Sequence, residues 1–249
     1  MVRGLELFSE HFEAYKDDYI IIGGLATAMV MKQLGFMSRT TKDIDLIILI
    51  DDNEDFLKEL LKFIKQGGYK TKQRTNHDNK HNLFRYLDPE DKTYPEQIEL
   101  FTVHSDDSVI LSGHYIIPVD TPESYPYLSA ILLNDDYYNL LLENSDFIED
   151  VHLATPLALI PLKIHAYLNL TEQGSSDAKK HLNDVIRLAA ILDGEKKIEL
   201  KSLPKEEYIS FVPIISNVEA DRFRSVLEGS QIHNFTKDDV LEQLQKYFS

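Results

Sequence analysis

Two aspartates that open an isoleucine- and leucine-rich run most constrain how this chain can fold. The run begins Asp43-Ile44-Asp45-Leu46 and continues in isoleucine and leucine to residue 50. Side chains alternate across a strand, so both aspartates would project from one face while Ile44 and Leu46 pack into a core on the other. The pattern predicts a central strand over residues 44–50 that carries two neighbouring carboxylates.

A diglycine precedes this strand. Tyr19-Ile20-Ile21-Ile22 is a short apolar run typical of a buried strand, and Gly23-Gly24 separates it from a helix-forming segment at residues 25–34. Glycine allows the backbone to approach a ligand closely, and the N–H groups at a helix start attract phosphate. In isolation, however, two glycines often form only a turn.

A third acid lies in a strand that we expect at residues 97–104. Glu99 is flanked by Ile98 and Leu100, so its side chain would lie on the face opposite theirs. Taken alone, Glu99 could be a solvent-facing residue of an edge strand. Carboxylates brought together repel one another, and a divalent cation that prefers hard oxygen ligands, such as Mg²⁺, removes that repulsion.

Together these residues resemble the DNA polymerase beta-like nucleotidyltransferase superfamily. Its pattern is a strand, Gly-Gly or Gly-Ser, a helix, Asp-x-Asp on the next strand, and one more acid on a later strand. The similarity covers residues 18–104. It is greatest to minimal bacterial members with a helical C-terminal domain, the AbiEii-like toxins and their relatives. In those proteins an Arg and a Thr precede Asp-Ile-Asp-Leu, as Arg39 and Thr41 do here.

The resemblance implies an α+β fold: a nucleotidyltransferase-type mixed sheet with flanking helices, followed by a helical C-terminal domain. We therefore expect a catalytic domain at residues 1–150 and a helical domain at residues 151–249. Helices are expected at residues 155–170 and 176–192, the second capped by Ser175 or Ser176. Two more are expected at residues 220–227 and 237–247, with Thr236 as the cap of the last.

The C-terminal half adds two motifs. The helix at 155–170 carries Lys163, and the next carries Lys180-His181-Leu182-Asn183-Asp184, similar to the family's Lys-Asp-x-x-Asp with His181 in place of an acid. The resemblance implies that Lys163 reaches nucleotide phosphate, while Lys180 and Asp184 support the cleft. Without the resemblance, Lys180 and Asp184 form an ordinary surface pair one turn apart, and Lys163 extends its ammonium group to water.

The activity that the resemblance implies is transfer of a nucleoside monophosphate from a triphosphate such as ATP to a hydroxyl group, with release of pyrophosphate. Asp43, Asp45 and Glu99 would bind one or two Mg²⁺ ions. The acceptor stays open among RNA, protein and a small molecule, and a toxin-like member would have a cognate antitoxin as partner. The residues expected to bind the nucleotide are Gly23, Gly24, Arg39, Thr41, Lys163, Lys180 and Asp184.

Two departures from the family pattern favour an alternative, a non-catalytic nucleotide- or protein-binding module with the same fold. Eighteen residues separate Gly24 from Asp43, more than is usual in the family. The second glycine is followed by Leu25 where a hydroxyl residue is usual, and Thr27 comes two places later. His181 in place of an acid points the same way.

Charge and composition limit the other possibilities. The net charge of −16 opposes indiscriminate binding to nucleic acid, although residues 58–85 are rich in lysine and arginine. That stretch is either a solvated helix face and loop or a patch for a polyanion such as RNA. His77 and His81 have zinc-ligand spacing for a helix, but their segment is expected to be a loop.

The chain contains no cysteine, which excludes disulfides and zinc-thiolate sites. No apolar run reaches membrane-spanning length, and residues 1–6 lack the apolar core of a signal peptide. We therefore expect a cytoplasmic protein that does not enter a membrane.

Overall fold

The structure is a computed structural model that describes residues 2–49, 54–71, 85–102, 109–111, 114–119, 128–132 and 134–248. The chain forms two compact units, which are described separately. Unit 1 comprises Met1–Leu25, Thr40–Asp135 and Phe147–Leu153. Unit 2 comprises Ala26–Arg39, Asp136–Asp146 and Ala154–Ser249. We expected a boundary between residues 150 and 151. The chain passes from unit 1 to unit 2 for the last time three residues later, between Leu153 and Ala154.

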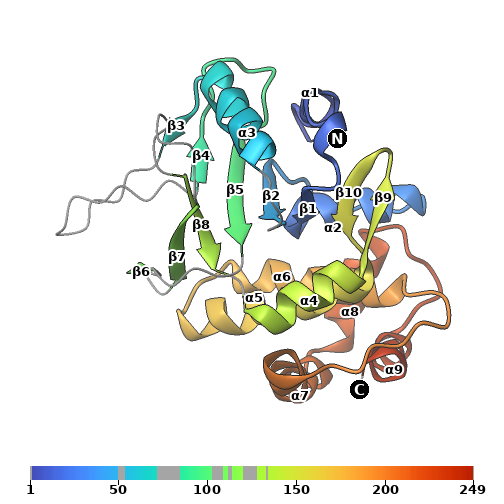
Figure 1. The fold of residues 1–249 in the computed structure, drawn as a ribbon. Coiled ribbons are helices and arrows are strands. Elements are labelled where there is room, and N and C mark those ends of the chain that lie inside the picture. Colours follow the sequence, from blue (N-terminus) through green and yellow to red (C-terminus); the bar gives the residue numbers. More distant parts are fainter. Residues whose placement is uncertain are drawn as a thin grey trace. The chain divides into compact units, whose positions relative to one another are not determined.

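Unit 1 is built around a mixed sheet (Figure 1). Over the described residues its main path has the strand order β6-β7-β8-β5-β2-β1-β10-β9, and β4 pairs with both β3 and β5. β2 runs antiparallel to β1 and parallel to β5. The strands are β1 (Tyr19–Ile22), β2 (Asp43–Ile48), β3 (Lys70–Thr71), β4 (Arg85–Leu87), β5 (Gln97–Thr102), β6 (Val109–Leu111), β7 (His114–Val119), β8 (Leu128–Leu132), β9 (Ser145–Ile148) and β10 (Val151–Ala154).

Strand β5 changes its neighbour along one edge. β4 runs antiparallel to it beside residues 97–99, and β8 runs parallel to it beside residues 101–102. Figure 1 shows β4 and β8 beside successive parts of β5. Glu99 therefore has β2 on one side and β4 on the other.

Aromatic side chains fill the core beneath the sheet of unit 1. They come from α1 (Leu5–His11), from β1 and from α3 (Glu54–Gly67). Phe8 packs edge-on against Phe63 with ring centroids 5.8 Å apart, and Tyr19 stacks on Phe56 at 6.0 Å. All four rings are buried, so these elements are held together by apolar burial. A 3-10 turn (Glu13–Tyr15) follows α1, and α2 (Gly23–Gln33) follows β1.

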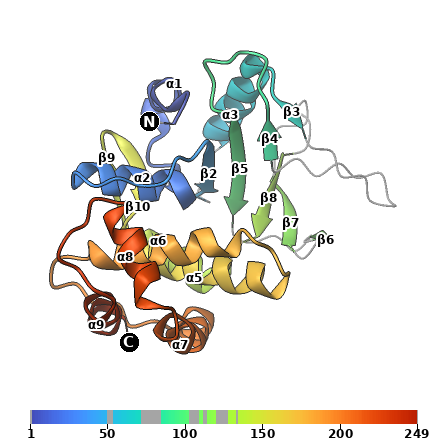
Figure 2. The same ribbon diagram turned by 180° about the vertical axis from the view of Figure 1, so that it is seen from behind.

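Unit 2 is helical. Besides residues 26–33 of α2, its helices are α4 (Asp135–Glu143), α5 (Pro156–Glu172), α6 (Ala178–Ala190), α7 (Ser202–Ser216), α8 (Ala220–Glu228) and α9 (Lys237–Tyr247). α5 packs against α6 and α7, and α6 also contacts α8 and α9 (Figure 2). Thr236 caps α9 through a reciprocal capping box with Asp239, as its position in the sequence predicts.

The expected fold class is confirmed. A mixed α+β sheet with flanking helices is followed by a helical C-terminal region, α5–α9. The expected helices and strands are present with ends shifted by a few residues. One correction concerns the first helix: the amphipathic pattern of residues 5–15 predicts a helix over that whole range, but the helix ends at His11. Another concerns α6, whose N-cap is Asp177; Ser175 instead accepts a hydrogen bond from the Asp177 N–H at 3.3 Å.

Expectations for the middle of the chain were less complete. The sequence shows few strand signals after residues 120–129, which predicts helices alone beyond them; this is wrong, because β8 runs from Leu128 to Leu132 and β9 and β10 follow. Helices α4 and α7 were not predicted. His77 and His81 lie outside the described residues, as do Lys72, Arg74 and Lys80 of the basic stretch. Lys58 and Lys62 of that stretch pair with acids of their own helix, as on a solvated helix face.

None of the helices in the described part of the chain combines the length and the apolar character that crossing a membrane requires.

Candidate functional site

Two of the three expected carboxylates are cross-strand neighbours in unit 1. Asp45 on β2 is in register with Glu99 on β5, and Asp43 is in register with Gln97. Residues in register on adjacent strands project from the same face, so Asp45 and Glu99 lie side by side with Asp43 one pleat along. Ile44, between the two aspartates, is fully buried on the opposite face, which confirms the alternation predicted for this strand.

The diglycine meets this face at Asp45. Gly23 has φ of +73°, a left-handed conformation that side chains disfavour. A Cβ atom at this position would stand 1.9 Å from Asp45 Oδ2. Gly23 is therefore required for its backbone conformation and also for space, because its Cα lies directly beneath the carboxylate.

The start of α2 presents backbone groups to this region. Leu25 and Thr27, the first apolar and hydroxyl residues after the diglycine, are both buried. A phosphate at this helix start would consequently contact main-chain N–H groups rather than a hydroxyl side chain. Thr41, which precedes β2, is half-buried.

A cation that the sequence analysis did not single out completes the group. Arg85 on β4 is in register with Glu99, and its Nη2 donates to Glu99 Oε1 at 2.5 Å. The only signal in the sequence is alternation in Arg85-Tyr86-Leu87, where the buried Tyr86 predicts that Arg85 faces the other way. Its partner could not be identified without the register of three strands.

The donor chemistry of the aspartates fits a hard divalent cation. Asp43 and Asp45 carry carboxylate oxygens on one face of the sheet, and the Gly23 backbone packs closely against Asp45 Oδ2. Among the described residues, no three His, Asp or Glu side chains are grouped closely enough to hold a metal ion. Glu99 fits a shared site less well, because one of its oxygens is committed to Arg85.

A second charged cluster lies in unit 2 around Asp184. This carboxylate is fully buried, and three cations surround it. Lys163 Nζ lies 3.1 Å from Oδ2, Arg39 Nε lies 3.3 Å from Oδ2, and Arg187 Nη1 lies 3.1 Å from Oδ1. Burial alone would raise the pKa of Asp184, but these cations outweigh it and hold the pKa below its ordinary value.

The cluster changes the interpretation of two lysines. Lys163 is only 3% exposed, so it does not extend to water but pairs with Asp184 inside the unit. Lys180 pairs instead with Asp177 at 3.3 Å on the surface. Arg187 was not identified from the sequence; its position one turn after Asp184 on α6 was the available signal.

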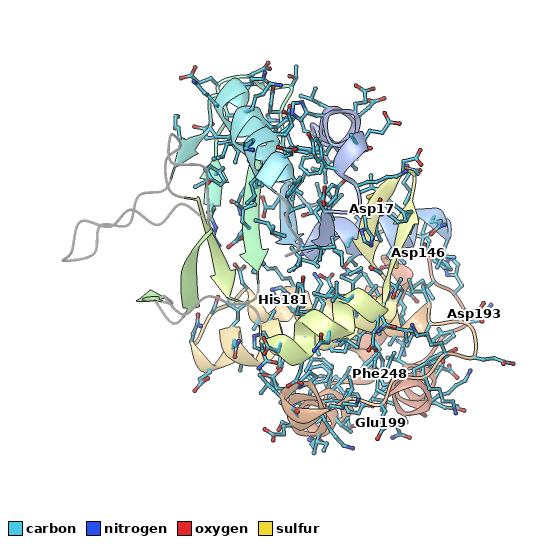
Figure 3. All side chains as sticks on the ribbon, viewed as in Figure 1. Asp17, Asp146, His181, Asp193, Glu199 and Phe248 are labelled. Atoms are coloured by element: carbon cyan, nitrogen blue, oxygen red, sulfur yellow. The ribbon has the colours of Figure 1, made fainter. Side chains whose placement is uncertain are left out.

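His181 borders the same cluster and is labelled in Figure 3. Burial and the nearby Lys163 lower its pKa to about 4, so the ring is neutral at pH 7. The cluster therefore carries a surplus of positive charge: three cations, one carboxylate and a neutral histidine. Within unit 2 this surplus is exposed mainly at Arg39, whose side chain is 30% exposed.

Comparison with known proteins finds similar solved structures. No protein-family model matches the chain, and no curated protein matches it. The crystal structure of the Megavirus polyadenylate synthase is similar, with a TM-score of 0.38 and 12% sequence identity over 86% of this chain. The chain covers 36% of that protein's length, so it spans about a third of it.

Proposed function

We propose that this protein is a metal-dependent nucleotidyltransferase. It would transfer a nucleoside monophosphate from a nucleoside triphosphate to a hydroxyl group and release pyrophosphate. The observation that carries the proposal is the placement of Asp45, which lies against the Gly23 backbone on one side and in register with Glu99 on the other. A phosphate-binding backbone and an acidic pair thus meet at one residue.

Asp43 and Asp45 would hold Mg²⁺, with Glu99 as the further acidic ligand. When bound, the ion would neutralise charge on the triphosphate and on the leaving pyrophosphate. The main-chain N–H groups of Gly23 and Gly24 would bind phosphate oxygens at the start of α2. Positioning and electrostatics of this kind supply most of the catalysis in phosphoryl transfer.

In unit 2, the charge surplus around Asp184 supports binding of a phosphate group. Lys163 and Arg187 are buried against Asp184 and would hold the cluster's geometry, while Arg39 at its exposed side would meet the anion. Lys180, on the surface of α6, and Thr41, before β2, would be additional nucleotide contacts. The acceptor would be RNA, a protein hydroxyl or a small molecule, and a toxin-like role would bring a cognate antitoxin.

The test is incorporation of label from each of the four α-³²P-labelled triphosphates, with Mg²⁺, into total RNA, protein and small-molecule acceptors. Asp43→Asn and Asp45→Asn keep side-chain shape and remove charge. Each should lower the rate by about 100-fold or more, since a bound metal contributes several kcal/mol to the transition state. The control is Asp55→Asn, which removes an exposed carboxylate from α3.

The second candidate is a nucleotide-binding module without turnover. The commitment of Glu99 to Arg85 and the buried Leu25 after the diglycine favour it. Saturable binding of a triphosphate, lost in the Asp45→Asn variant, together with no labelled acceptor under any condition, would establish the module and exclude the enzyme.

A further inference from the structure

We infer that His181 is a contact for a phosphate group bound at the cation cluster around Asp184 in unit 2. His181 Nδ1 would hydrogen-bond to the phosphate, and the ring would take up a proton as the phosphate binds. The inference rests on the proposed function only in taking phosphate as the ligand. It gives a role to a residue that the proposed reaction does not use.

One nitrogen of the His181 ring is buried without a hydrogen bond. Nδ1 is shielded from solvent and has no hydrogen-bond partner among the described residues. Buried polar atoms are almost always hydrogen-bonded, and an exception commonly marks the place of a water molecule or an ion. The residue as a whole is half-buried, so a small anion needs only a local shift of side chains to reach Nδ1.

The charges around the ring favour an anion over water. Burial is the main cause of the low pKa of His181, about 4, and Lys163 on α5 adds to it. Lys180 on α6 and Arg39 after α2 lower this pKa as well, whereas Asp184 raises it. Among the described residues of α8 and α9, which also pack against α6, none shifts this pKa. A water molecule at Nδ1 would leave the surplus of positive charge in place, whereas an anion would offset it.

Positive charge is also in excess on the other side of Asp184. Arg187 pairs with Asp184 at 3.1 Å, which raises the pKa of the Arg187 guanidinium. Burial and the nearby cations Arg39 and Arg222 outweigh this pairing and lower that pKa. Arg222 on α8 has a neutral partner, Asn183 Oδ1, at 3.0 Å. One carboxylate thus faces several cations, and a doubly charged phosphate would balance them.

Anion binding and proton uptake at His181 strengthen each other. A bound dianion offsets the cations, so the pKa of His181 rises from about 4 towards its ordinary value of 6.5. Between these values the complex binds more protons than the free protein, so the phosphate binds more tightly as the pH falls. Asp184 stays ionised in this range, because its pKa lies below the ordinary 3.8.

The experiment follows His181 in the full chain by proton NMR, with and without sulfate. Sulfate has the shape of phosphate and keeps its double charge across the pH range, so every titration observed belongs to the protein. Saturating sulfate should raise the pKa of His181, read from its Cε1 proton, to about 5 or above. His181→Asn assigns the signal by its disappearance, and His181→Gln provides a second assignment if the first variant fails to fold.

Titration calorimetry measures the same coupling as a change in affinity. The wild-type protein should bind sulfate about tenfold more tightly at about pH 5.5 than at about pH 7.5. His181→Asn cannot take up the proton and should bind sulfate equally at both. His233→Asn, the same change at an exposed histidine of unit 2, should keep the difference. Arg39→Gln should weaken binding at both pH values.

Two sources could supply the phosphate, the nucleoside triphosphate and a phosphorylated acceptor. The arm that distinguishes them adds ATP with Mg²⁺ to the protein saturated with sulfate. Displacement of sulfate would assign the site to a phosphate of the nucleotide. Binding of ATP and sulfate at the same time would assign it to a phosphate of the acceptor.

Three results would each overturn the inference: a pKa of His181 that sulfate leaves unchanged, a pH dependence of sulfate binding that persists in His181→Asn, or sulfate binding that is absent or unaffected by Arg39→Gln. The proposed function is tested separately, by the loss of labelled transfer in Asp45→Asn. Proton-coupled sulfate binding without any labelled acceptor would retain the anion site and reject the enzyme. Labelled transfer without such coupling would do the reverse.

Discussion

The carboxylate of Asp45 occupies the space that a side chain on Gly23 would need, since a Cβ there would stand 1.9 Å from Oδ2. Gly23→Ala should therefore destabilise the protein in two ways. The left-handed backbone costs about 1–2 kcal/mol for a non-glycine residue. The overlap with Asp45 should add about 1–3 kcal/mol, as overpacking does in cores. Urea unfolding would measure the sum.

Gly35 provides the matched control for this change. Its φ is +79°, close to the value at Gly23, but no atom beyond its two chain neighbours lies within 4 Å of the position of its Cβ. Gly35→Ala should consequently show the backbone cost alone. An equal decrease in the free energy of unfolding in Gly23→Ala and Gly35→Ala would mean that Gly23 and Asp45 are not in close contact.

Substitution of Asp184 should lower the free energy of unfolding more than substitution at most other positions of unit 2. Asp184→Asn leaves Lys163 and Arg187 largely buried without a counter-charge, and breaking a buried charge network in this way typically costs about 3–5 kcal/mol. The exposed Asp177, which pairs only with Lys180 among the ion pairs of the described residues, is the comparison. Asp177→Asn should change the free energy of unfolding by less than about 1 kcal/mol.

His181 should make stability depend on pH between about 4 and 6.5. Its pKa is lowered to about 4 in the folded state from an ordinary value near 6.5, so in this window the unfolded chain binds the extra proton. The free energy of unfolding therefore rises with pH across the window and falls by about 1–3 kcal/mol on acidification. The pKa of Asp184 is also lowered, so this carboxylate changes the free energy of unfolding only below its ordinary pKa of 3.8, outside the window of His181.

The measurement for His181 is urea unfolding at half-unit pH steps. His181→Asn should flatten the dependence between pH 4 and 6.5, whereas the same change at the exposed His233 should leave the slope as in the wild type. An unaltered slope in the His181 variant would assign the pH dependence to other groups.

The capping box of α9 gives a prediction that follows from sequence and structure alike. Thr236→Ala removes the hydroxyl that accepts the Asp239 N–H and should cost about 1 kcal/mol. Thr171, whose hydroxyl donates to a carbonyl near the end of α5, is a threonine outside any cap. Thr171→Ala should stay within about 0.5 kcal/mol of the wild type by thermal unfolding.

Local patterns in the sequence predicted the parts of the site that depend on neighbouring residues. Alternation placed Asp43 and Asp45 on one face and Ile44 in the core. The diglycine marked the strand-to-helix turn, and Thr236 marked the start of α9. Each of these depends on residues within a few positions of one another, so one stretch of sequence was enough.

The contacts between distant segments could not be predicted in this way. Arg85 meets Glu99 only because β4 and β2 pair on opposite sides of β5, and no local pattern encodes that register. Asp184 takes a partner from position 39, 145 residues away. These pairings follow from the whole fold rather than from spacing.

Two missed elements have local causes. The turn between β9 and β10 uses Glu149 and Asp150 with φ of 51° and 61°, so the glycine or asparagine that usually marks such a hairpin is absent. Helix α7 contains Pro213 in its interior, which is a signal for helix interruption in the sequence. In both cases the tertiary structure overrides the local preference of the chain.

The exchange of neighbours along β5 divides the sheet of unit 1 into parts that can vary independently. β4 ends beside the half of β5 that carries Glu99, and the extension through β8, β7 and β6 joins only beyond residue 100. Insertions or deletions in that extension would leave the Asp45–Glu99 alignment unchanged. Evolution, or an engineer, could thus exchange β8, β7 and β6 for another extension of the sheet while retaining the acidic face beside Gly23.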